Sequence, residues 1–110
     1  KTFKPSSYAT VMSADEAETI GNYMITTVQS GTASALSGAS YTAAGKTGSA
    51  EYDTASGERG THSWFVGYTN VDNPELAIAV IAEDGGSGSS TAVPIAKYIF
   101  DTYYQNKYGY

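Results

Sequence analysis

The chain has 110 residues, of which 41% are hydrophobic and 15% are charged, so it can bury a single core. Its formal net charge of -5 argues against nucleic acid as a partner, because phosphate binding rests on clustered cations. The sequence has no Cys and one His, which excludes a disulfide framework and argues against a metal site. No apolar run approaches the roughly 18 residues that a membrane span needs. We expect residues 1–110 to form one small domain or a piece of a larger one, with no metal and no cofactor.

The first predicted element is a helix over about 14–29. Ser13 followed three residues later by Glu16 is a capping-box pattern, which marks a helix start. Gly31 can take the left-handed cap that ends a helix. Apolar residues follow the start at helical spacing: Ala17, Ile20, Met24, Ile25 and Val28.

Three strands are predicted next, over 41–52, 61–69 and 76–82. The last two are apolar at consecutive positions, which is typical of strands covered on both faces. The connections between the three are short and polar, and short connections favour antiparallel neighbours. We therefore expect a three-stranded antiparallel sheet.

A glycine- and serine-rich stretch over 85–90 is interpreted as a flexible loop, and a second helix is predicted from about 91. Pro94 lies in its first turn, where the missing N–H costs little. An apolar stripe follows: Val93, Ala96, Phe100, Tyr103 and Tyr104. The expected fold class is α+β, a three-stranded antiparallel sheet with flanking N- and C-terminal helices that cover both of its faces.

The strand over 76–82 presents a difficulty. If the strands pair in sequence order, this apolar strand becomes a sheet edge, which is a pairing and aggregation hazard. We hypothesise that further strands from outside this chain lie beside it. Self-association through 76–82 is the alternative, and a clean monomer on size-exclusion chromatography would argue against both.

The C-terminal tyrosines are interpreted as packing residues rather than as a carbohydrate-stacking surface. Helical spacing favours packing for Tyr98, Tyr103 and Tyr104. Tyr108 and Tyr110 are expected to belong to a loose terminus.

The segment that carries chemistry is Lys46-Thr47-Gly48-Ser49. On a strand, Lys46 and Gly48 point to one side, and Thr47 and Ser49 point to the other. Gly48 allows close approach of a ligand or another backbone, and an edge strand can accept a peptide as one more strand. Lys46 can activate a neighbouring hydroxyl or balance a carboxylate. These residues alone also fit a glycine-rich strand with a surface lysine.

In its wider context, residues 41–51 closely resemble the third active-site motif of penicillin-binding proteins, in which Lys-Thr-Gly recurs. Gly31-Thr32-Ala33 resembles the end of the family's preceding helix, and 62–68 resembles the following strand. The last predicted strand, the glycine-rich loop and the closing helix continue the likeness, which runs over nearly all of 14–105. The chain most resembles the transpeptidase domain of a class B, monofunctional penicillin-binding protein, and so a partial β-lactamase/transpeptidase-like fold.

The resemblance implies roles for the motif residues. Lys46 would stay protonated and assist proton transfer beside a serine of a Ser-x-Asn motif. Thr47, Gly48 and Ser49 would bind substrate, with the hydroxyls of Thr47 and Ser49 holding the terminal carboxylate of the peptide or of a β-lactam. The backbone N–H of Ser49 would be one of two oxyanion-hole donors, which makes Lys46 and Ser49 the implied catalytic pair.

Two motifs of the family are absent from this chain. No Lys has a Ser three residues before it, and no Asn has a Ser two residues before it, so Ser-x-x-Lys and Ser-x-Asn are both missing. In the family both precede Lys-Thr-Gly. We therefore expect residues 1–110 to be the C-terminal part of the domain, inactive alone, with the missing strands joining at the 76–82 edge.

The whole protein is thus expected to be a serine-type D,D-transpeptidase that cross-links peptidoglycan stem peptides and binds β-lactams. Its expected place is the extracytoplasmic face of a bacterial membrane, with an anchor upstream. The remainder of the transpeptidase domain is the expected partner of this chain. Open alternatives are a β-lactamase, a D,D-carboxypeptidase or a β-lactam sensor, one half of a two-chain enzyme, and a non-catalytic interaction module.

Overall fold

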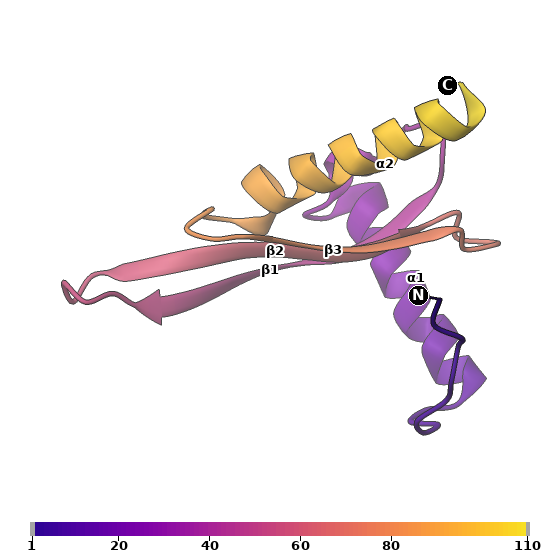
Figure 1. The fold of residues 1–110 in the computed structure, drawn as a ribbon, viewed down its shortest axis with the longest axis horizontal. Helices are drawn as coiled ribbons and strands as arrows, with labels where there is room; N and C mark the ends of the chain where they lie inside the picture. Colours follow the sequence, from indigo (N-terminus) through magenta and orange to yellow (C-terminus); the bar gives the residue numbers. More distant parts are fainter. Residues whose placement is uncertain (1, 110) are drawn as a thin grey trace.

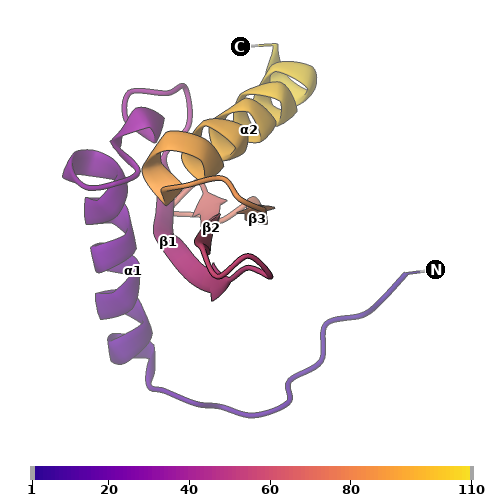
Figure 2. The ribbon, with the colours of Figure 1, turned by 90° about the vertical axis from the view of Figure 1, so that its left-hand side faces the viewer.

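The computed structural model describes residues 2–109 and folds as two helices against one sheet. The main elements are α1 (Ala14–Ser30), β1 (Ala43–Asp53), β2 (Arg59–Thr69), β3 (Leu76–Ala82) and α2 (Val93–Tyr108). The strands are antiparallel, in the order β1-β2-β3. Figure 1 shows the sheet nearly edge-on, with α2 above it and α1 running below, and Figure 2 shows α1 beside β1. The predicted α+β class is confirmed.

Helix α1 begins where the capping pattern places it. The Ser13 hydroxyl accepts a hydrogen bond from the Glu16 N–H at 3.1 Å, and the Glu16 carboxylate accepts one from the Ser13 N–H at 3.0 Å. The predicted apolar stripe is only partly used, because Val28 is buried while Ile20 is 45% exposed. Among the described residues, α1 therefore packs mainly through its C-terminal end.

The hairpin of β1 and β2 is the longest paired segment. Its register pairs Lys46 with Val66 and Gly48 with Trp64. Relative to the sequence-based bounds, β1 begins two residues later, at Ala43, and β2 begins two residues earlier, at Arg59. The strand over 76–82 was predicted with its observed bounds.

The core lies between α2 and one face of the sheet. Phe65 of β2 is fully buried and meets Phe100 of α2 edge to face, with ring centroids 6.5 Å apart. The apolar stripe predicted for the second helix is confirmed, since Tyr103 packs on the core partly buried and the other four residues are fully or almost fully buried: Val93, Ala96, Phe100 and Tyr104. This packing fixes α2 across the sheet.

The opposite face of the sheet is open at β3. Side chains alternate along a strand, and those of Ala77, Ala79 and Ile81 are exposed, with Ile81 at 72%. The expectation that helices cover both faces is therefore wrong for this strand. The reason is the position of α1, which packs beside β1 and leaves β3 uncovered.

The stretch interpreted as a flexible loop contains an ordered turn over Gly88–Ala92 with π-helical hydrogen bonding. The buried Ser63 hydroxyl donates to the Ser87 carbonyl at 2.9 Å and accepts from the Ala92 N–H at 3.1 Å. A short hydroxyl side chain on β2 thereby ties this turn to the sheet. Sequence composition does not reveal such a tie, because it depends on a residue 24 positions away.

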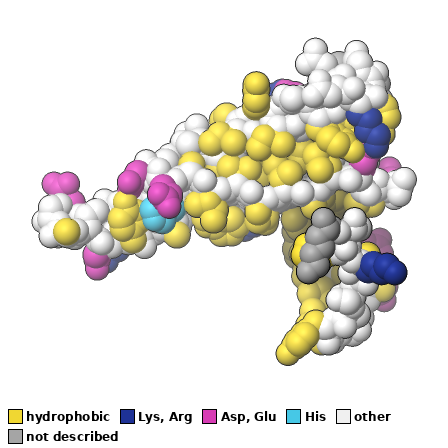
Figure 3. All heavy atoms as spheres, viewed as in Figure 1, with side chains coloured by type: hydrophobic (Ala, Val, Ile, Leu, Met, Phe, Trp, Pro, Cys, Tyr) yellow, Lys and Arg dark blue, Asp and Glu magenta, His cyan; other side chains and the backbone are white. Residues whose placement is uncertain are grey.

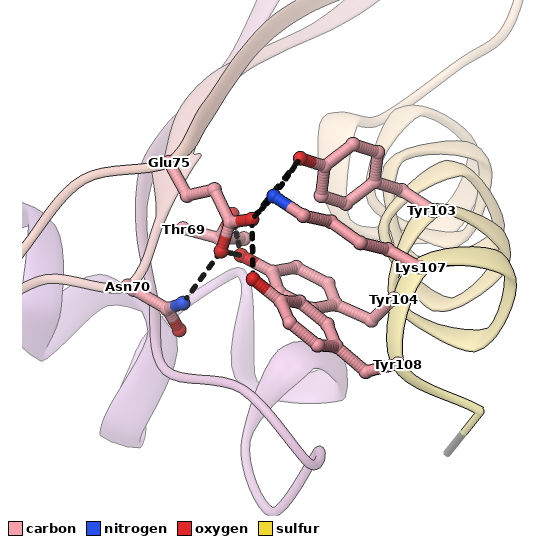
Figure 4. Close-up of polar contacts among 7 residues, drawn as sticks. All are labelled: Thr69, Asn70, Glu75, Tyr103, Tyr104, Lys107 and Tyr108. Atoms are coloured by element: carbon pink, nitrogen blue, oxygen red, sulfur yellow. Dashed lines mark hydrogen bonds and ion pairs between the residues drawn. The ribbon is translucent and has the colours of Figure 1, made fainter.

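Glu75, at the turn before β3, anchors the end of α2 (Figure 4). Its carboxylate accepts hydrogen bonds from Tyr103 at 3.1 Å and Tyr108 at 2.7 Å, and forms an ion pair with Lys107. Asn70 also donates to it, at 3.1 Å. The Lys107 ammonium and these hydroxyl donors lower the pKa of Glu75 to about 2.

The interpretation of the C-terminal tyrosines was right for two residues and wrong for two. Tyr104 is buried and Tyr103 is partly buried, as expected. Tyr98 is 73% exposed, because it lies on the outer side of α2. Tyr108 is held by Glu75 and stacks on Tyr104 with ring centroids 5.7 Å apart, so it does not belong to a loose end. Tyr110 lies outside the described residues.

Within residues 2–109, neither helix combines the length and the apolar character required to cross a bilayer.

Candidate active-site strand

The motif residues lie together on β1, which is a sheet edge among the described residues. Lys46 and Ser49 are exposed, whereas Thr47 is only 7% exposed. Since β1 pairs only with β2, the N–H and C=O groups that point away from β2 are available to an additional strand. The geometry therefore permits a peptide to add to β1 as one more strand, as expected from the sequence.

Lys46 and Thr47 point to different faces. The register pairs Lys46 with Val66 of β2, and Val66 in turn with Ala79 of β3, so Lys46 lies on the open face of the sheet. Its amino group donates a hydrogen bond to the carbonyl of Thr47. Thr47 points to the face covered by α2 and its preceding turn, as strand alternation predicts. Any group that reacts beside Lys46 must therefore approach from the open face or from the free edge.

Gly48 allows a close approach, and the approaching group is Trp64. A Cβ atom built on Gly48 would lie 2.0 Å from Cε2 of the Trp64 indole. Only glycine fits at this point of β1 without moving the ring. A ligand or another backbone was expected here from the sequence, whereas the Trp64 side chain on β2 takes the space.

The hydroxyl of Thr47 is paired with that of Thr32, which follows the end of α1. The two oxygens are 2.6 Å apart, and either can be the donor. Gly88, in the turn before α2, also packs against Thr47, since a Cβ on Gly88 would lie 2.9 Å from Cβ of Thr47. Sequence reasoning used Thr32 only as part of the Gly-Thr-Ala likeness, and it missed both contacts because they join segments far apart in the chain.

The strand continues into a small polar cluster beyond the motif. Tyr52 stacks on His62 with ring centroids 4.3 Å apart, and its hydroxyl donates to the Asp84 carboxylate. The Asp84 N–H donates to Nδ1 of His62 at 3.2 Å. His62 thus has structural partners in Tyr52 and Asp84. Glu51 is paired with Arg59 at 2.5 Å.

Other candidate sites are separate from the motif. A cavity of about 220 Å³ lies between α1 and the start of β1, and its lining includes Ile25, Leu36 and Tyr41 but none of the motif residues. Across residues 2–109, no group of three or more His, Asp or Glu side chains is placed to hold a metal ion. The site chemistry available here therefore comes from the ammonium and hydroxyl groups of β1 and from Thr32.

The comparisons with known proteins all find similarity to penicillin-binding protein transpeptidases. The family model described as the penicillin-binding protein transpeptidase domain matches residues 2–101. The peptidoglycan D,D-transpeptidase MrdA of Haemophilus influenzae is 38% identical over 87% of this chain, and the chain spans 16% of that relative. The MrdA of Acinetobacter baumannii is 42% identical over 71% of this chain and 13% of its own length.

Solved structures show the same likeness. Pseudomonas aeruginosa PBP2 aligns with 98% of this chain at 29% identity and a TM-score of 0.76, over 24% of its own chain. Penicillin-binding protein 2B from Streptococcus pneumoniae covers 96% of this chain at 24% identity with a TM-score of 0.78, which shows the shared fold. This chain spans 18% of that protein.

Proposed function

Because the chain belongs to the penicillin-binding protein transpeptidase domain family, we propose that it supplies one wall of the active site of a peptidoglycan D,D-transpeptidase. The observation that carries the proposal is the position of Lys46 and Ser49, both exposed on a free strand edge. The names of the relatives favour a D,D-transpeptidase over a β-lactamase or a carboxypeptidase. A coincidental Lys-Thr-Gly in an interaction module does not account for a family match over residues 2–101.

In the proposed reaction, a serine from the remainder of the domain attacks the peptide carbonyl of a stem peptide. The serine O–C bond forms, the C–N bond to the terminal D-alanine breaks, and D-alanine leaves with the serine proton. An amine of a second stem peptide then attacks the ester, forms the cross-link and restores the serine. A β-lactam undergoes the first step, in which its ring C–N bond breaks and the ester remains.

Each motif residue has one task in this scheme. The Lys46 ammonium stabilises negative charge and assists proton transfer at the reacting serine. The hydroxyls of Thr47 and Ser49 bind the terminal carboxylate, and the Ser49 N–H donates to the oxyanion. Gly48 leaves room for the Trp64 indole beside β1.

The reacting serine belongs to polypeptide outside this chain, which contains no Ser-x-x-Lys. The open face of the sheet indicates the side from which that polypeptide approaches Lys46. Lys46 shares this face with Val66, which is 38% exposed, and with Ile81, which is 72% exposed. Exposed apolar side chains that share one face favour contact with another segment, and a segment placed there would also approach Lys46.

The unpaired edge of β3 supports the same arrangement. Figure 3 shows hydrophobic side chains gathered over α2 and β3 on the side of the molecule where β3 forms the sheet edge. Since the chain spans only 16% of its Haemophilus relative, the occupant we propose is the remainder of the transpeptidase domain, which adds strands to β3. The alternative occupant of the β3 edge is a second copy of this chain. A full-length protein that is monomeric in solution would exclude it.

The proposed location of the whole protein is the extracytoplasmic face of a bacterial membrane, where peptidoglycan is cross-linked. Anchoring through a segment upstream of this chain belongs to the same proposal. A membrane-impermeant label applied to intact cells tests this location, because it should react with the full-length protein. Labelling only after lysis of the cytoplasmic membrane would contradict the proposal.

The direct test of the function uses a fluorescent penicillin and intact-mass measurement. The full-length protein is expected to gain one covalent adduct, and the 110-residue chain alone is expected to gain none because it lacks the serine. Boiling in detergent before labelling serves as the control for non-specific acylation. A covalent adduct on the isolated chain, or none on the folded full-length protein, would refute the proposal.

A further inference from the structure

The hairpin of β1 and β2 continues past the end of β3, and we call its residues 50–62 the arm. Strand β3 pairs with β2 only over residues 63–69, so within residues 2–109 no third strand supports the arm. Figure 1 shows the arm projecting beyond β3 and α2. A two-stranded ribbon without further packing is marginally stable at best and twists more strongly than a wider sheet. The course of β1 beyond the motif therefore depends on what fixes the arm to the rest of the chain.

Tyr52 fixes the arm from the face of β1 that also carries Lys46. Its ring lies across β2 at Gly60, since a Cβ on Gly60 would stand 2.3 Å from Cζ of Tyr52. The ring stacks on His62 with centroids 4.3 Å apart, and its hydroxyl donates to the carboxylate of Asp84, two residues after β3. The Asp84 N–H donates to Nδ1 of His62 at 3.2 Å. We call this set of contacts among Tyr52, His62 and Asp84 the clasp.

Asp84 is the member of the clasp that lies outside the arm. Its carboxylate accepts from Tyr52 of β1 and its N–H donates to His62 of β2, so one residue holds both strands. Its φ of 53° is a left-handed conformation, which Asp adopts more readily than most residues. The hydrogen bond to this carboxylate raises the pKa of Tyr52 above its ordinary value, so the hydroxyl stays protonated and donates.

The proposed reaction brings the ligand alongside the arm. In that scheme the hydroxyls of Thr47 and Ser49 bind the terminal carboxylate, and the Ser49 N–H binds the oxygen of the scissile carbonyl, one residue earlier in the peptide. The peptide chain, followed backwards from its carboxylate, therefore runs from Thr47 past Ser49, antiparallel to β1. At about 3.4 Å per residue in both strands, the residues that precede the scissile bond lie beside the arm.

We propose that Tyr52 is a positioning residue of the transpeptidase: through the clasp it keeps the arm in line with the motif, so that the part of the stem peptide before the scissile bond can pair with β1. The inference rests on the proposed function and adds to it a residue that acts only through the position of β1. Loss of the clasp should therefore impair ligands that extend along the arm and spare ligands that end at the motif.

The test compares acylation of the full-length protein by benzylpenicillin and by 6-aminopenicillanic acid. Both contain the same ring system and carboxylate, but only benzylpenicillin carries an acyl side chain, which takes the place of the preceding peptide residues. Tyr52→Phe keeps the aromatic ring and removes the hydroxyl. It is expected to lower the rate with benzylpenicillin about three- to tenfold relative to the rate with 6-aminopenicillanic acid, the range of one hydrogen bond. Hydrogen exchange of the amides in residues 50–62 should become faster in the same variant.

Variants of Asp84 test the other half of the clasp. Asp84→Gly tolerates the positive φ and removes the carboxylate, so it should lower the rate ratio as Tyr52→Phe does. The double variant should lower the ratio no further, because the two residues form one interaction. Asp84→Asn keeps an acceptor oxygen and should keep the wild-type ratio. Tyr98→Phe is the matched control, because Tyr98 is 73% exposed on the outer side of α2, and it should change neither the ratio nor the exchange.

The outcomes separate this inference from the proposed function. An unchanged rate ratio in Tyr52→Phe, or a lower ratio without faster exchange in the arm, would overturn the role of the clasp and leave the transpeptidase proposal standing. If benzylpenicillin does not acylate the wild type, the proposed function itself fails.

Discussion

The Trp64 indole lies directly against Gly48, close enough that a Cβ on Gly48 would stand 2.0 Å from Cε2 of the ring. The contact joins β1 to β2 on the face that also carries Lys46. It makes the middle glycine of the motif a packing requirement as well as a feature of the ligand-binding edge. The shape of β1 and the position of Lys46 therefore depend on a side chain of the neighbouring strand.

Gly48→Ala is accordingly expected to displace the indole and to lower both stability and acylation. Overpacking of this kind costs about 1–3 kcal/mol, which we expect as a lowered thermal midpoint of the full-length protein. Gly21→Ala is the matched control, because its added Cβ meets only the Tyr68 hydroxyl at 3.4 Å, an ordinary contact. Equal thermal midpoints and labelling rates for Gly48→Ala and the wild type would contradict this packing argument.

Lys46→Ala is expected to lower the rate of penicillin acylation about 100-fold or more, the scale of a group that assists proton transfer. The fold should be retained because the Lys46 side chain is exposed. Stopped-flow measurement of the acylation rate checks the effect, and Lys4→Ala, at an exposed position before α1, provides the control. A Lys46→Ala protein that acylates at the wild-type rate would remove Lys46 from the mechanism.

Ser49→Ala is expected to weaken acylation by carboxylate-bearing β-lactams about 10- to 100-fold, since one hydrogen bond to a charged group is lost. The backbone N–H at this position is retained, so the oxyanion contribution should persist. Ser49→Thr should retain most of the activity because it keeps the hydroxyl. The acylation rates with benzylpenicillin and with its methyl ester, which lacks the anionic carboxylate, check this role. A Ser49→Ala protein that loses as much rate with the methyl ester as with benzylpenicillin would show that the hydroxyl does not bind the carboxylate.

Glu75 is expected to make stability depend on acid pH. Its folded-state pKa of about 2 lies below the ordinary value of 4.5, so its contribution is complete above about pH 4.5 and is lost as the pH falls toward 2. Glu75→Gln should therefore lower the thermal midpoint at pH 7 and lessen the drop between pH 5 and about 2. Glu18→Gln, at an exposed position on α1, should change neither. An identical pH profile for Glu75→Gln and wild type would contradict this role.

Much of the fold could be predicted from local signals. The Ser13 and Glu16 capping box fixed the start of α1, and the apolar stripe of the second helix identified the residues that α2 buries. The edge position of the strand over 76–82 also agrees with the expectation that strands pair in sequence order. The helix start and the apolar stripe depend on neighbours within a turn or two of the chain, which periodicity reports well.

The features that sequence reasoning missed are contacts between distant segments. The hydrogen bond of Thr32 to Thr47 spans 15 positions, and that of Ser63 to Ser87 spans 24. Tyr108 was assigned to a loose end because its partner, Glu75, lies 33 positions earlier. The helical cover expected over β3 is absent for another reason: α1 packs beside β1 instead, and we propose that the remainder of the domain supplies the cover.

The central claim is that β1 forms one wall of a cleft whose reacting serine comes from the rest of the domain. A crystal structure of the full-length protein acylated by a penicillin tests it most directly. We expect the ligand along the free edge of β1, with its carboxylate within about 3 Å of a hydroxyl of Ser49 or of the Thr32–Thr47 pair. A ligand bound elsewhere, with a strand of the same protein paired along that edge of β1, would contradict the account.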